Sequence, residues 1–394
     1  MTSHDKHAAL ESFRSGQPVG VDFAAIEKEL AVLWKEASAT PGSGSTPAVT
    51  RACHLNLVVL CAGAGESSRA TATVAQLARV SPARVIMADV AVDEDGADAD
   101  RLEALITAHC TLSSGSDAAG SAASGPGRGR QVCCEQITIT AAGAASARLP
   151  GAVLSLLLPD LPVALWCPGD PDLASPVARR LVEASDRLVI DSRRFVDPAR
   201  GFAQLAALER PVSDLAWHRL RPWRELAAGQ FDVRLYEAYP ERLDTIEVEH
   251  AGPPKNQTKA LMLGCWAATR LHWRPDLVGK GFAFLRGDGK PARLLITPRK
   301  DREPAGRILS LALRAGPAEF VVRRTGPADC VELTAAVPEA CPVSRTSRVV
   351  PRDEATLLSR CLNSGDADET YDEALHLAAR LLAPGNLTDT EKKP

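Results

Sequence analysis

Short apolar runs alternate with segments of helical periodicity between residues 54 and 191, and this alternation constrains the fold most. Apolar strands separated by helices predict a mostly parallel sheet that is covered on both faces. The expected strands are His54–Cys61, Arg84–Val90, Val132–Thr140, Val163–Trp166 and Arg187–Asp191, and the expected helices are Glu66–Arg79, Ala145–Leu157 and Pro176–Ala184. Arg101–His109 fits a strand or a helix. We predict a Rossmann-like α/β domain over residues 49–210.

The pattern changes after residue 210, where short strands follow one another with few helices between them. The expected elements begin with the strands Arg242–His250 and Gly281–Arg286 around a helix at Lys255–Leu271. The strands expected next, Pro291–Thr297, Arg307–Arg314, Glu319–Arg324 and Cys330–Ala335, are short and predict antiparallel pairing. Two helices are expected at 352–363 and 368–382. We predict an α+β domain over residues 211–385.

The remaining segments are polar or of low complexity. Residues 1–48 comprise a polar tail, an amphipathic helix from Asp22 to Ala37 and a linker at 40–47. Asp22 is the expected N-cap of that helix, and its apolar stripe consists of Phe23, Ile26, Leu30 and Leu33. The Gly/Ser/Ala-rich stretch Ser113–Arg130 predicts a disordered loop, and residues 386–394 form a polar tail.

Composition limits the classes of partner. A chain of 394 residues is long enough for two domains with their own cores. The net charge of -3 gives no global basic field, so no nucleic-acid partner is expected. The most apolar region, 152–167, contains Pro159, Asp160 and Pro162 and is too short to span a bilayer, and the polar N-terminus lacks a signal peptide. We therefore expect a cytoplasmic protein with no membrane partner.

The cysteines and histidines show no metal-binding pattern. The ten cysteines include no C-x-x-C pair, and the histidines are scattered. In a reducing compartment a permanent disulfide framework is not expected. Cys61 and Cys265 lie in apolar runs and are expected to be core residues. The sequence thus predicts neither a metal site nor a bound cofactor.

One loop resembles part of a dinucleotide-binding fingerprint. Gly63 and Gly65 follow an expected strand and open an expected helix, Ser67 stands near the position of the third glycine, and Asp89 ends the next strand where a ribose-binding carboxylate would lie. Such a loop could direct backbone N–H groups at a pyrophosphate. The alternative is an ordinary strand-to-helix turn, since such turns favour glycine and serine. No other catalytic motif occurs, so catalytic residues are not expected.

The segment 212–226 concentrates tryptophan and arginine in a chain with few aromatic residues. Pro222 fits the first position of a helix that continues through Trp223, and Leu215 and Trp217 fit an extended segment that leads into it. One interpretation is a core corner whose arginines pair with Asp214 and Glu225. The other is a binding surface, because tryptophan and arginine are enriched in interface hot spots.

A proline-bounded turn follows the expected strand at 163–166. Trp166 lies at the carboxyl end of that strand, the edge that carries ligand or partner sites in open α/β sheets. A stiff loop loses little conformational entropy when it binds a partner. The equally weighted alternative is that Trp166 only fills the core of the domain.

Several motifs together resemble those of the OpcA family of glucose-6-phosphate dehydrogenase assembly proteins. The first is the D-L-A-W-x-R-L-x-x-W-R-E-L pattern that begins at Asp214. The others, in order along the chain, are Thr50-Arg51 leading to residues 55–59, Cys134–Thr138, Leu158–Gly169, Ser185–Ser192 and Trp266–Trp273. The resemblance covers roughly residues 50 to 380. The low-complexity stretch at 113–130 and Cys167 within the Trp-Cys-Pro turn depart from the family pattern.

The resemblance implies a non-catalytic protein that binds glucose-6-phosphate dehydrogenase, promotes assembly of its active oligomer and activates it. It would thereby control NADPH production in the oxidative pentose phosphate pathway. The residues expected to form or support the contact surface are Trp166, Asp214, Trp217, Arg219, Trp223 and Arg224. The alternative is an enzyme that binds NAD(P) or a sugar phosphate through the Gly63/Gly65 loop.

Overall fold

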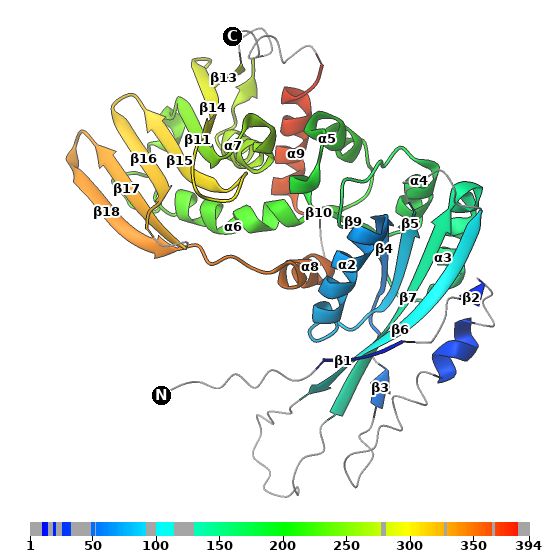
Figure 1. Cartoon of the computed structure of the whole chain (residues 1–394). Coiled ribbons are helices and arrows are strands. Elements are labelled where there is room, and N and C mark those ends of the chain that lie inside the picture. Colours follow the sequence, from blue (N-terminus) through cyan, green and yellow to red (C-terminus); the bar gives the residue numbers. More distant parts are fainter. Residues whose placement is uncertain are drawn as a thin grey trace, which may run out of the picture. The chain divides into compact units, whose positions relative to one another are not determined.

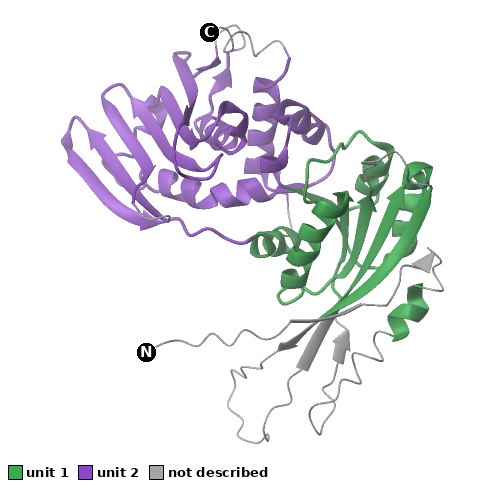
Figure 2. Cartoon of the chain, viewed as in Figure 1, with its two compact units in different colours: residues 1–190, 354–364 green, residues 191–353, 365–394 purple. Residues whose placement is uncertain are grey.

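The computed structural model describes residues 10–14, 19–20, 26–32, 49–51, 53–91, 100–113, 130–276, 281–326, 329–364 and 367–384. The chain divides into two compact units (Figure 2). Unit 1 consists of residues 1–190 and 354–364, and unit 2 consists of residues 191–353 and 365–394. The predicted domain boundary at residue 210 stays a prediction.

The centre of the sheet in unit 1 is parallel, as predicted. In spatial order its strands are β7 (Arg130–Ala142), β5 (Arg84–Val90), β4 (Asn56–Ala62), β8 (Val163–Cys167) and β9 (Arg187–Ile190) (Figure 1). Along the chain these are the third, second, first, fourth and fifth parallel strands, which is the strand order of dinucleotide-binding folds. The order reverses between β4 and β8, so the edge at their carboxyl ends is the topological switch point.

The outer part of this sheet is antiparallel. β6 (Arg101–Ser113) pairs antiparallel with β7, and β1 (Leu10–Arg14) pairs antiparallel with β6. The predicted choice between strand and helix at 101–109 is therefore resolved as a strand. Two short strands, β2 (Val19–Gly20) and β3 (Val49–Arg51), pair with β6 and β7 respectively.

Helices cover the parallel strands, and burial explains the apolar runs. Val85, Ile86, Met87 and Ala88 of β5 are all at most 1% exposed. α2 (Ala64–Leu77) packs on β4 and β5, and α8 (Glu354–Asn363), from far along the chain, packs on α2. The 3-10 helix η1 (Gly143–Arg148) leads into α3 (Leu149–Ser155), which contacts α4 (Pro176–Glu183).

Unit 2 contains a mixed sheet. Its strands in spatial order are β12 (Arg274–Pro275), β13 (Phe282–Leu285), β14 (Pro291–Arg299), β11 (Thr245–Ala251), β15 (Ile308–Ala315), β16 (Ala318–Arg324), β17 (Cys330–Val337) and β18 (Ala340–Arg348). Neighbours are antiparallel except β11 and β14, which run parallel. The antiparallel pairing predicted from Pro291 onward is confirmed for β15 to β18. It is wrong in part for β14, which runs antiparallel to β13 but parallel to β11, because the chain crosses over through α7 between β11 and β14. The α+β class of residues 211–385 stays a prediction.

The helices of unit 2 are α5 (Pro198–Ala206), α6 (Leu215–Ala228), α7 (Thr258–Arg270) and α9 (Glu369–Leu381). α7 packs on β11 and β14, α6 packs on β16, and α9 contacts both α5 and α7. The sequence pattern did not reveal α5 or β18. The signal for α5 was present, because Asp197 caps its N-terminus through the N–H groups of Ala199 and Arg200, and Pro198 takes its first position. β18 is a largely exposed edge strand without apolar alternation.

The predicted start of the helix at Pro222 is wrong. α6 begins at Leu215 and contains Pro222, so Leu215 and Trp217 are helical rather than extended. Asp214 at the N-cap directs the chain into a helix earlier than the proline does. Proline removes one helical hydrogen bond, but the buried Trp217, Leu220 and Trp223 on both sides of it keep the helix packed.

Some of the residues that the sequence analysis singled out lie inside the described ranges, and others lie outside them. Ile26 and Leu30 lie in a helical segment at 26–32 and are buried, as expected. Asp22, Phe23 and Leu33, the linker at 40–47, the loop at 114–129 and the tail at 386–394 lie outside the described residues. Cys61 and Cys265 are core residues, as predicted. No helix in the described ranges has the length and apolar character that crossing a bilayer requires.

Candidate functional site

Asp214 anchors the start of α6. Its side chain is 0% exposed and accepts hydrogen bonds from the Ala216 N–H at 2.8 Å, the Ser192 N–H at 3.0 Å and the Ser192 hydroxyl at 2.6 Å. Burial and then the nearby charge of Asp191 raise the pKa of the Asp214 carboxyl to about 6. Its partners are thus Ser192 and the helix N-terminus, and the predicted pairing of Asp214 with arginine is wrong because the carboxylate caps the helix.

Arg219 pairs with Asp191 instead. Its Nη1 lies 3.0 Å from Asp191 Oδ2, and Arg193 Nη2 approaches the same oxygen at 2.5 Å. Burial alone would raise the pKa of Asp191, but the hydrogen bonds and charges of Arg193 and Arg219 outweigh burial and lower it. The other predicted pair is confirmed, since Arg221 Nε lies 2.7 Å from Glu225 Oε1 on the exposed side of α6.

Trp217 connects α6 to α9. Its side chain is 1% exposed, and its indole N–H donates to Asp368 Oδ2 at 2.7 Å. Tyr371 of α9 packs edge-on against the indole at 5.5 Å between ring centroids, and the Arg224 guanidinium lies 3.5 Å from the ring centroid on α6. Asp368 also accepts the Tyr371 N–H as the cap of α9. Trp217 therefore holds two helix termini together.

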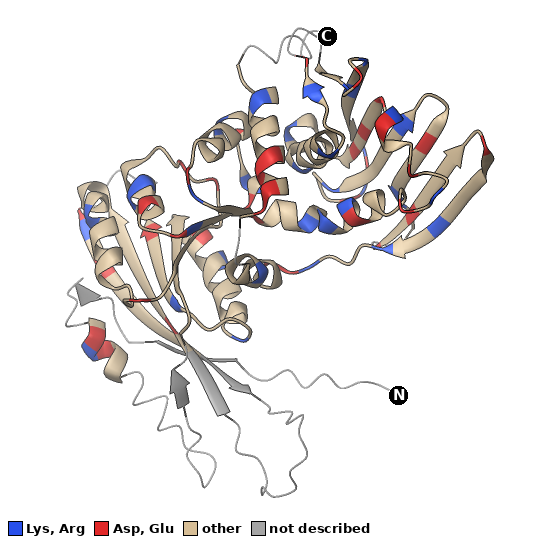
Figure 3. Ribbon diagram, turned by 180° about the vertical axis from the view of Figure 1, so that it is seen from behind, with Lys and Arg blue, Asp and Glu red and all other residues tan. Residues whose placement is uncertain are grey.

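The tryptophan- and arginine-rich segment at 212–226 has a buried side and an exposed side. Trp223 is buried, and the Arg324 guanidinium of β16 lies 5.8 Å from the centroid of its ring. Arg221 and Glu225 are exposed, and Arg219 and Arg224 are half-buried. Lys and Arg are interspersed with Asp and Glu along the ribbon of unit 2 (Figure 3). Any direct contact made by α6 would thus involve its arginines and Glu225 rather than its tryptophans.

Trp166 lies in the interior of unit 1. It belongs to β8 and is 0% exposed, and its indole N–H finds no hydrogen-bond acceptor among the described residues. The neighbouring Cys167 thiol is also buried, which raises its pKa to about 12. A role for Trp166 in partner binding would therefore be indirect, through the shape of the turn that follows it.

The loop at Gly63 makes the strand-to-helix turn of a dinucleotide-binding fold. Gly63 has a φ of +85°, which favours glycine, and precedes α2 as its N-cap. Its N–H donates to Asp89 Oδ1 at 3.1 Å, and Ser67 also hydrogen-bonds the Asp89 carboxylate. Gly65 lies in the first turn of α2. The structure therefore brings together the four residues of the predicted nucleotide loop, but Asp89 bonds the loop itself.

Glu66, which the sequence pattern did not single out, occupies the switch point. Its Oε2 accepts the Ala62 N–H at 3.0 Å, and its carboxylate lies against Gly169, where a Cβ atom would overlap it. Ala62 ends β4, and Gly169 follows β8, the two strands between which the order reverses. A dinucleotide phosphate binds in this crevice at the start of the helix in proteins that use it. In this protein the Glu66 carboxylate occupies the crevice at the start of α2.

Gly169→Ala is expected to lower the free energy of unfolding by about 1 kcal/mol, because the added methyl group displaces Glu66 and breaks its bond to the Ala62 N–H. In a Glu66→Ala background the same change should cost close to nothing. Denaturant unfolding of the two single variants and the double variant measures this coupling. An equal cost of Gly169→Ala in both backgrounds would contradict the placement of Glu66.

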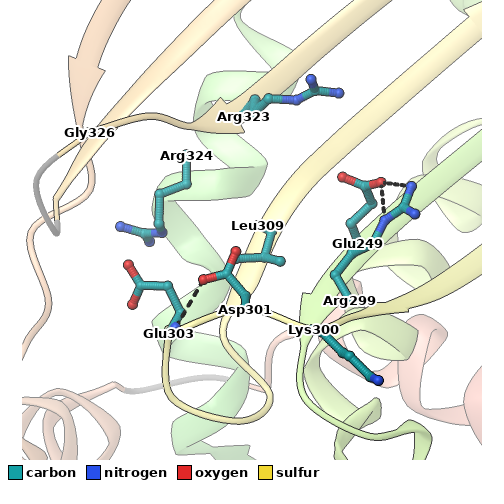
Figure 4. A pocket seen from close by; sticks show the side chains of 9 residues that line it. All are labelled: Glu249, Arg299, Lys300, Asp301, Glu303, Leu309, Arg323, Arg324 and Gly326. Atoms are coloured by element: carbon teal, nitrogen blue, oxygen red, sulfur yellow. Dashed lines mark hydrogen bonds and ion pairs between the residues drawn. The ribbon is translucent and has the colours of Figure 1, made fainter.

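A charged pocket of about 460 Å³ lies at the ends of strands β11, β14, β15 and β16 of the unit 2 sheet (Figure 4). On one side Arg299 pairs with Glu249 at 2.5 Å, and on the other the Glu303 N–H donates to Asp301 Oδ1 at 2.9 Å. Its lining residues are Glu249, Arg299, Lys300, Asp301, Glu303, Leu309, Arg323, Arg324 and Gly326. Arg324 also contacts Trp223, so this pocket and α6 share a residue. The sequence analysis did not single out this pocket, although a run of charged residues at 299–303 could have indicated it.

No group of three or more His, Cys, Asp and Glu side chains that could hold a metal ion occurs in the described part of the chain. Asp214, Arg219 and Arg221 at α6 are instead engaged in capping bonds and ion pairs. At the Gly63 loop, Glu66 and Asp89 accept backbone N–H groups. Neither place presents the arrangement of nucleophile, base and oxyanion donors that covalent or acid–base catalysis needs.

Two family models match the chain. The glucose-6-phosphate dehydrogenase subunit N-terminal domain matches residues 74–207, and the corresponding C-terminal domain matches residues 210–375. Both the Gly169 turn and α6 lie within the matched ranges. Together the two models cover well over half of the chain.

Individual relatives agree with the family models. "Putative OxPP cycle protein OpcA" of Synechocystis is 28% identical over 269 residues, which is 64% of this chain and 56% of the relative. The protein of the same name from Nostoc punctiforme is 28% identical over 215 residues, 54% of this chain and 43% of that one. The chain thus spans about half the length of the curated relatives it matches.

Among solved structures, the aldose-aldose oxidoreductase from Caulobacter crescentus is similar at 12% identity with a TM-score of 0.38, covering 83% of this chain and 97% of that one. Structural similarity at this level gives no indication of the activity of this chain. The family models, however, extend over both halves of the sequence. The chain belongs to the OpcA family of glucose-6-phosphate dehydrogenase assembly proteins.

Proposed function

We propose that this protein binds glucose-6-phosphate dehydrogenase, promotes assembly of its active oligomer and raises its activity, without catalysing a reaction itself. It would thereby control the production of NADPH in the oxidative pentose phosphate pathway. The observation that carries the proposal is the match of both family models, one on each half of the chain. The charge of Glu66 at the switch point supports the non-catalytic part, because it repels a dinucleotide phosphate there.

The physical mechanism is a shift between two states of the dehydrogenase. The protein activates only if it binds the active state more tightly than the inactive state. That difference in binding free energy limits the activation, and a tenfold shift of the equilibrium needs about 1.4 kcal/mol. No catalytic group on the activator is required.

The proposed contact surface is the exposed side of α6. Arg221 and Glu225 face solvent there, and Arg219 and Arg224 are half-buried beside them. The buried Asp214, Trp217 and Trp223 hold the helix in place. In unit 1, Trp166 would support the turn at 167–169 in the same indirect way.

Arg221→Glu is expected to weaken binding of the dehydrogenase about tenfold, since it reverses one exposed charge at the proposed contact. Stability should change by less than about 0.5 kcal/mol, because Arg221 is exposed and its ion pair with Glu225 is weak. The measurement is a titration of labelled dehydrogenase. Arg179→Glu on α4, also an exposed arginine, is the matched control. Equal affinity of the two variants would exclude this side of α6 from the interface.

The second candidate is an enzyme that binds NAD(P) or a sugar phosphate through Gly63, Gly65, Ser67 and Asp89. The favourable observation is the strand order of the sheet in unit 1. We expect no saturable binding of NADH to the protein alone, because Glu66 and Asp89 already accept the N–H groups of Ala62 and Gly63. Saturable binding that is lost in a Gly63→Val variant would favour the enzyme.

Complex formation tests the proposed function. The protein is mixed with the dehydrogenase of its own source, and size-exclusion chromatography with light scattering follows the mass. We expect one species heavier than either protein alone. Separate elution of the two proteins at concentrations well above those in cells would contradict the proposal.

A further inference from the structure

The charged pocket of unit 2 has more positive than negative groups in its lining. Four basic side chains and three carboxylates line about 460 Å³, a volume in the range of sites for small organic molecules. Figure 4 shows Arg323 and Arg324 of β16 on one side of the pocket and the loop with Asp301 and Glu303 on the other. The partners of these charges determine what the pocket can bind.

Two of the three carboxylates are already bonded within the protein. Glu249 Oε1 accepts a hydrogen bond from Arg299 Nε at 2.8 Å, and its Oε2 accepts one from the Ser310 hydroxyl at 2.7 Å. Glu303 Oε2 lies 2.9 Å from Arg307 Nη1. Both carboxylates therefore have partners before any ligand enters the pocket.

Arg323 and Lys300 are basic side chains of the pocket that have no such partner. The strand register places Glu249, Ser310 and Arg323 in one row across β11, β15 and β16, on the same face of the sheet. Ser310 thus lies between the two charges, and two strand spacings, about 10 Å, separate Arg323 from Glu249. Neither the Arg323 guanidinium nor the Lys300 ammonium group forms a hydrogen bond or ion pair with any residue that the structure describes.

Arg324 adds positive charge on the same side of the pocket. It is half-buried, with its guanidinium 5.8 Å from the ring centroid of Trp223 and its Nε 3.4 Å from the Ile308 carbonyl oxygen. Burial and then the charge of Arg307 lower the pKa of Arg324, since both disfavour its charged form. An anion in the pocket would offset this electrostatic cost.

Asp301 is the carboxylate with an oxygen to spare. Its Oδ1 accepts the Glu303 N–H at 2.9 Å, which fixes the side chain in the loop. No described residue bonds its Oδ2. A carboxylate oxygen accepts a hydrogen bond from a hydroxyl group and repels another anion. The pocket therefore presents cations for an anionic group and an acceptor for a hydroxyl group.

We propose that this pocket binds a small organic anion that also carries hydroxyl groups, such as a sugar phosphate or a sugar acid. Arg323 and Lys300 pair with the phosphate or carboxylate oxygens, which match the fork of a guanidinium group. Asp301 accepts a hydroxyl group and so disfavours a bare anion. The site lies wholly in unit 2 and is measured on the protein alone, so it does not depend on the proposed activation of a dehydrogenase.

Calorimetric titrations at low ionic strength, where salt screens exposed charges least, test the pocket. The probes are glucose 6-phosphate, gluconate, inorganic phosphate and glucose. We expect saturable binding of glucose 6-phosphate or gluconate, and the tighter of the two identifies the anionic group. Inorganic phosphate and glucose should each bind at least about tenfold more weakly, because each lacks one of the two kinds of group. The proposal is overturned if neither hydroxylated anion binds, or if inorganic phosphate binds as tightly as they do.

Arg323→Met should weaken binding of the tighter anion about tenfold or more, because it removes a charge-assisted hydrogen bond. Asp301→Ala should remove most of the preference for the hydroxylated anion over inorganic phosphate. Arg345→Met, which removes an exposed arginine of β18 outside the pocket, is the control and should leave binding unchanged. We expect the same Tm for Arg323→Met as for the native protein, since Arg323 is exposed. Unchanged affinity in Arg323→Met would also overturn the proposal.

Discussion

Trp217→Ala is expected to lower the free energy of unfolding of unit 2 by about 4 kcal/mol. The change removes a buried indole that packs against Tyr371 and under Arg224, and it leaves a cavity between α6 and α9. It also removes the N–H donor to Asp368, which caps α9. Denaturant unfolding followed by circular dichroism measures the loss.

Trp217→Phe is the matched control for this prediction. It keeps most of the packing and loses the indole N–H, so its expected cost is smaller, about 1 to 2 kcal/mol. A loss below about 1 kcal/mol for Trp217→Ala would show that the site collapses around the cavity and that Trp217 does not hold the two helices together.

Asp214→Ala is expected to destabilise the protein by about 3 kcal/mol at pH 8, and by about 1 kcal/mol more at pH 5. The pH-independent part arises because three buried or helix-terminal donors on Ser192 and Ala216 lose their acceptor. The pH-dependent part follows from the raised pKa of Asp214. An acid with a raised pKa stabilises the folded state fully below its ordinary value of 3.8, and this contribution is lost as the pH rises through about 6.

Asp214→Asn separates the pH-independent loss of hydrogen bonds from the pH-dependent loss of a titrating carboxyl group. Its carbonyl oxygen still accepts from the N–H groups of Ser192 and Ala216, so the expected loss is smaller than for alanine. It cannot titrate, so it should show the same change with pH relative to the native protein as Asp214→Ala. Asp191 remains in all three proteins, so its own opposite pH dependence largely cancels in the comparison. Identical losses at pH 5 and pH 8 would contradict the raised pKa of Asp214.

The parallel sheet of unit 1 could be predicted because buried strands read as continuous apolar runs, as in Arg84–Val90. The edge strand β18 could not, because its side chains are exposed and show no alternation. The start of α6 was misplaced because Pro222 is a strong local signal, while the packing of Trp217 against Tyr371 depends on residues more than a hundred positions away. Local propensity is a weak prior when such tertiary packing opposes it.

The residue types of the candidate site were predictable, but their partners were not. The sequence singled out Asp214, Arg219 and Trp217, yet Arg219 pairs with Asp191 and Trp217 bonds Asp368, contacts that only the fold creates. Glu66 escaped notice because the fingerprint concerns glycines and the ribose-binding carboxylate.

The rate of glucose-6-phosphate dehydrogenase, measured across substrate concentrations with and without a molar excess of this protein, tests the central claim most directly. The dehydrogenase should come from the same source, and Arg221→Glu with its Arg179→Glu control should be assayed beside the native protein. We predict a raised kcat or a lowered KM that saturates with added protein and is weakened only by Arg221→Glu. An unchanged kcat and KM at saturating amounts of the native protein would contradict the proposed activation.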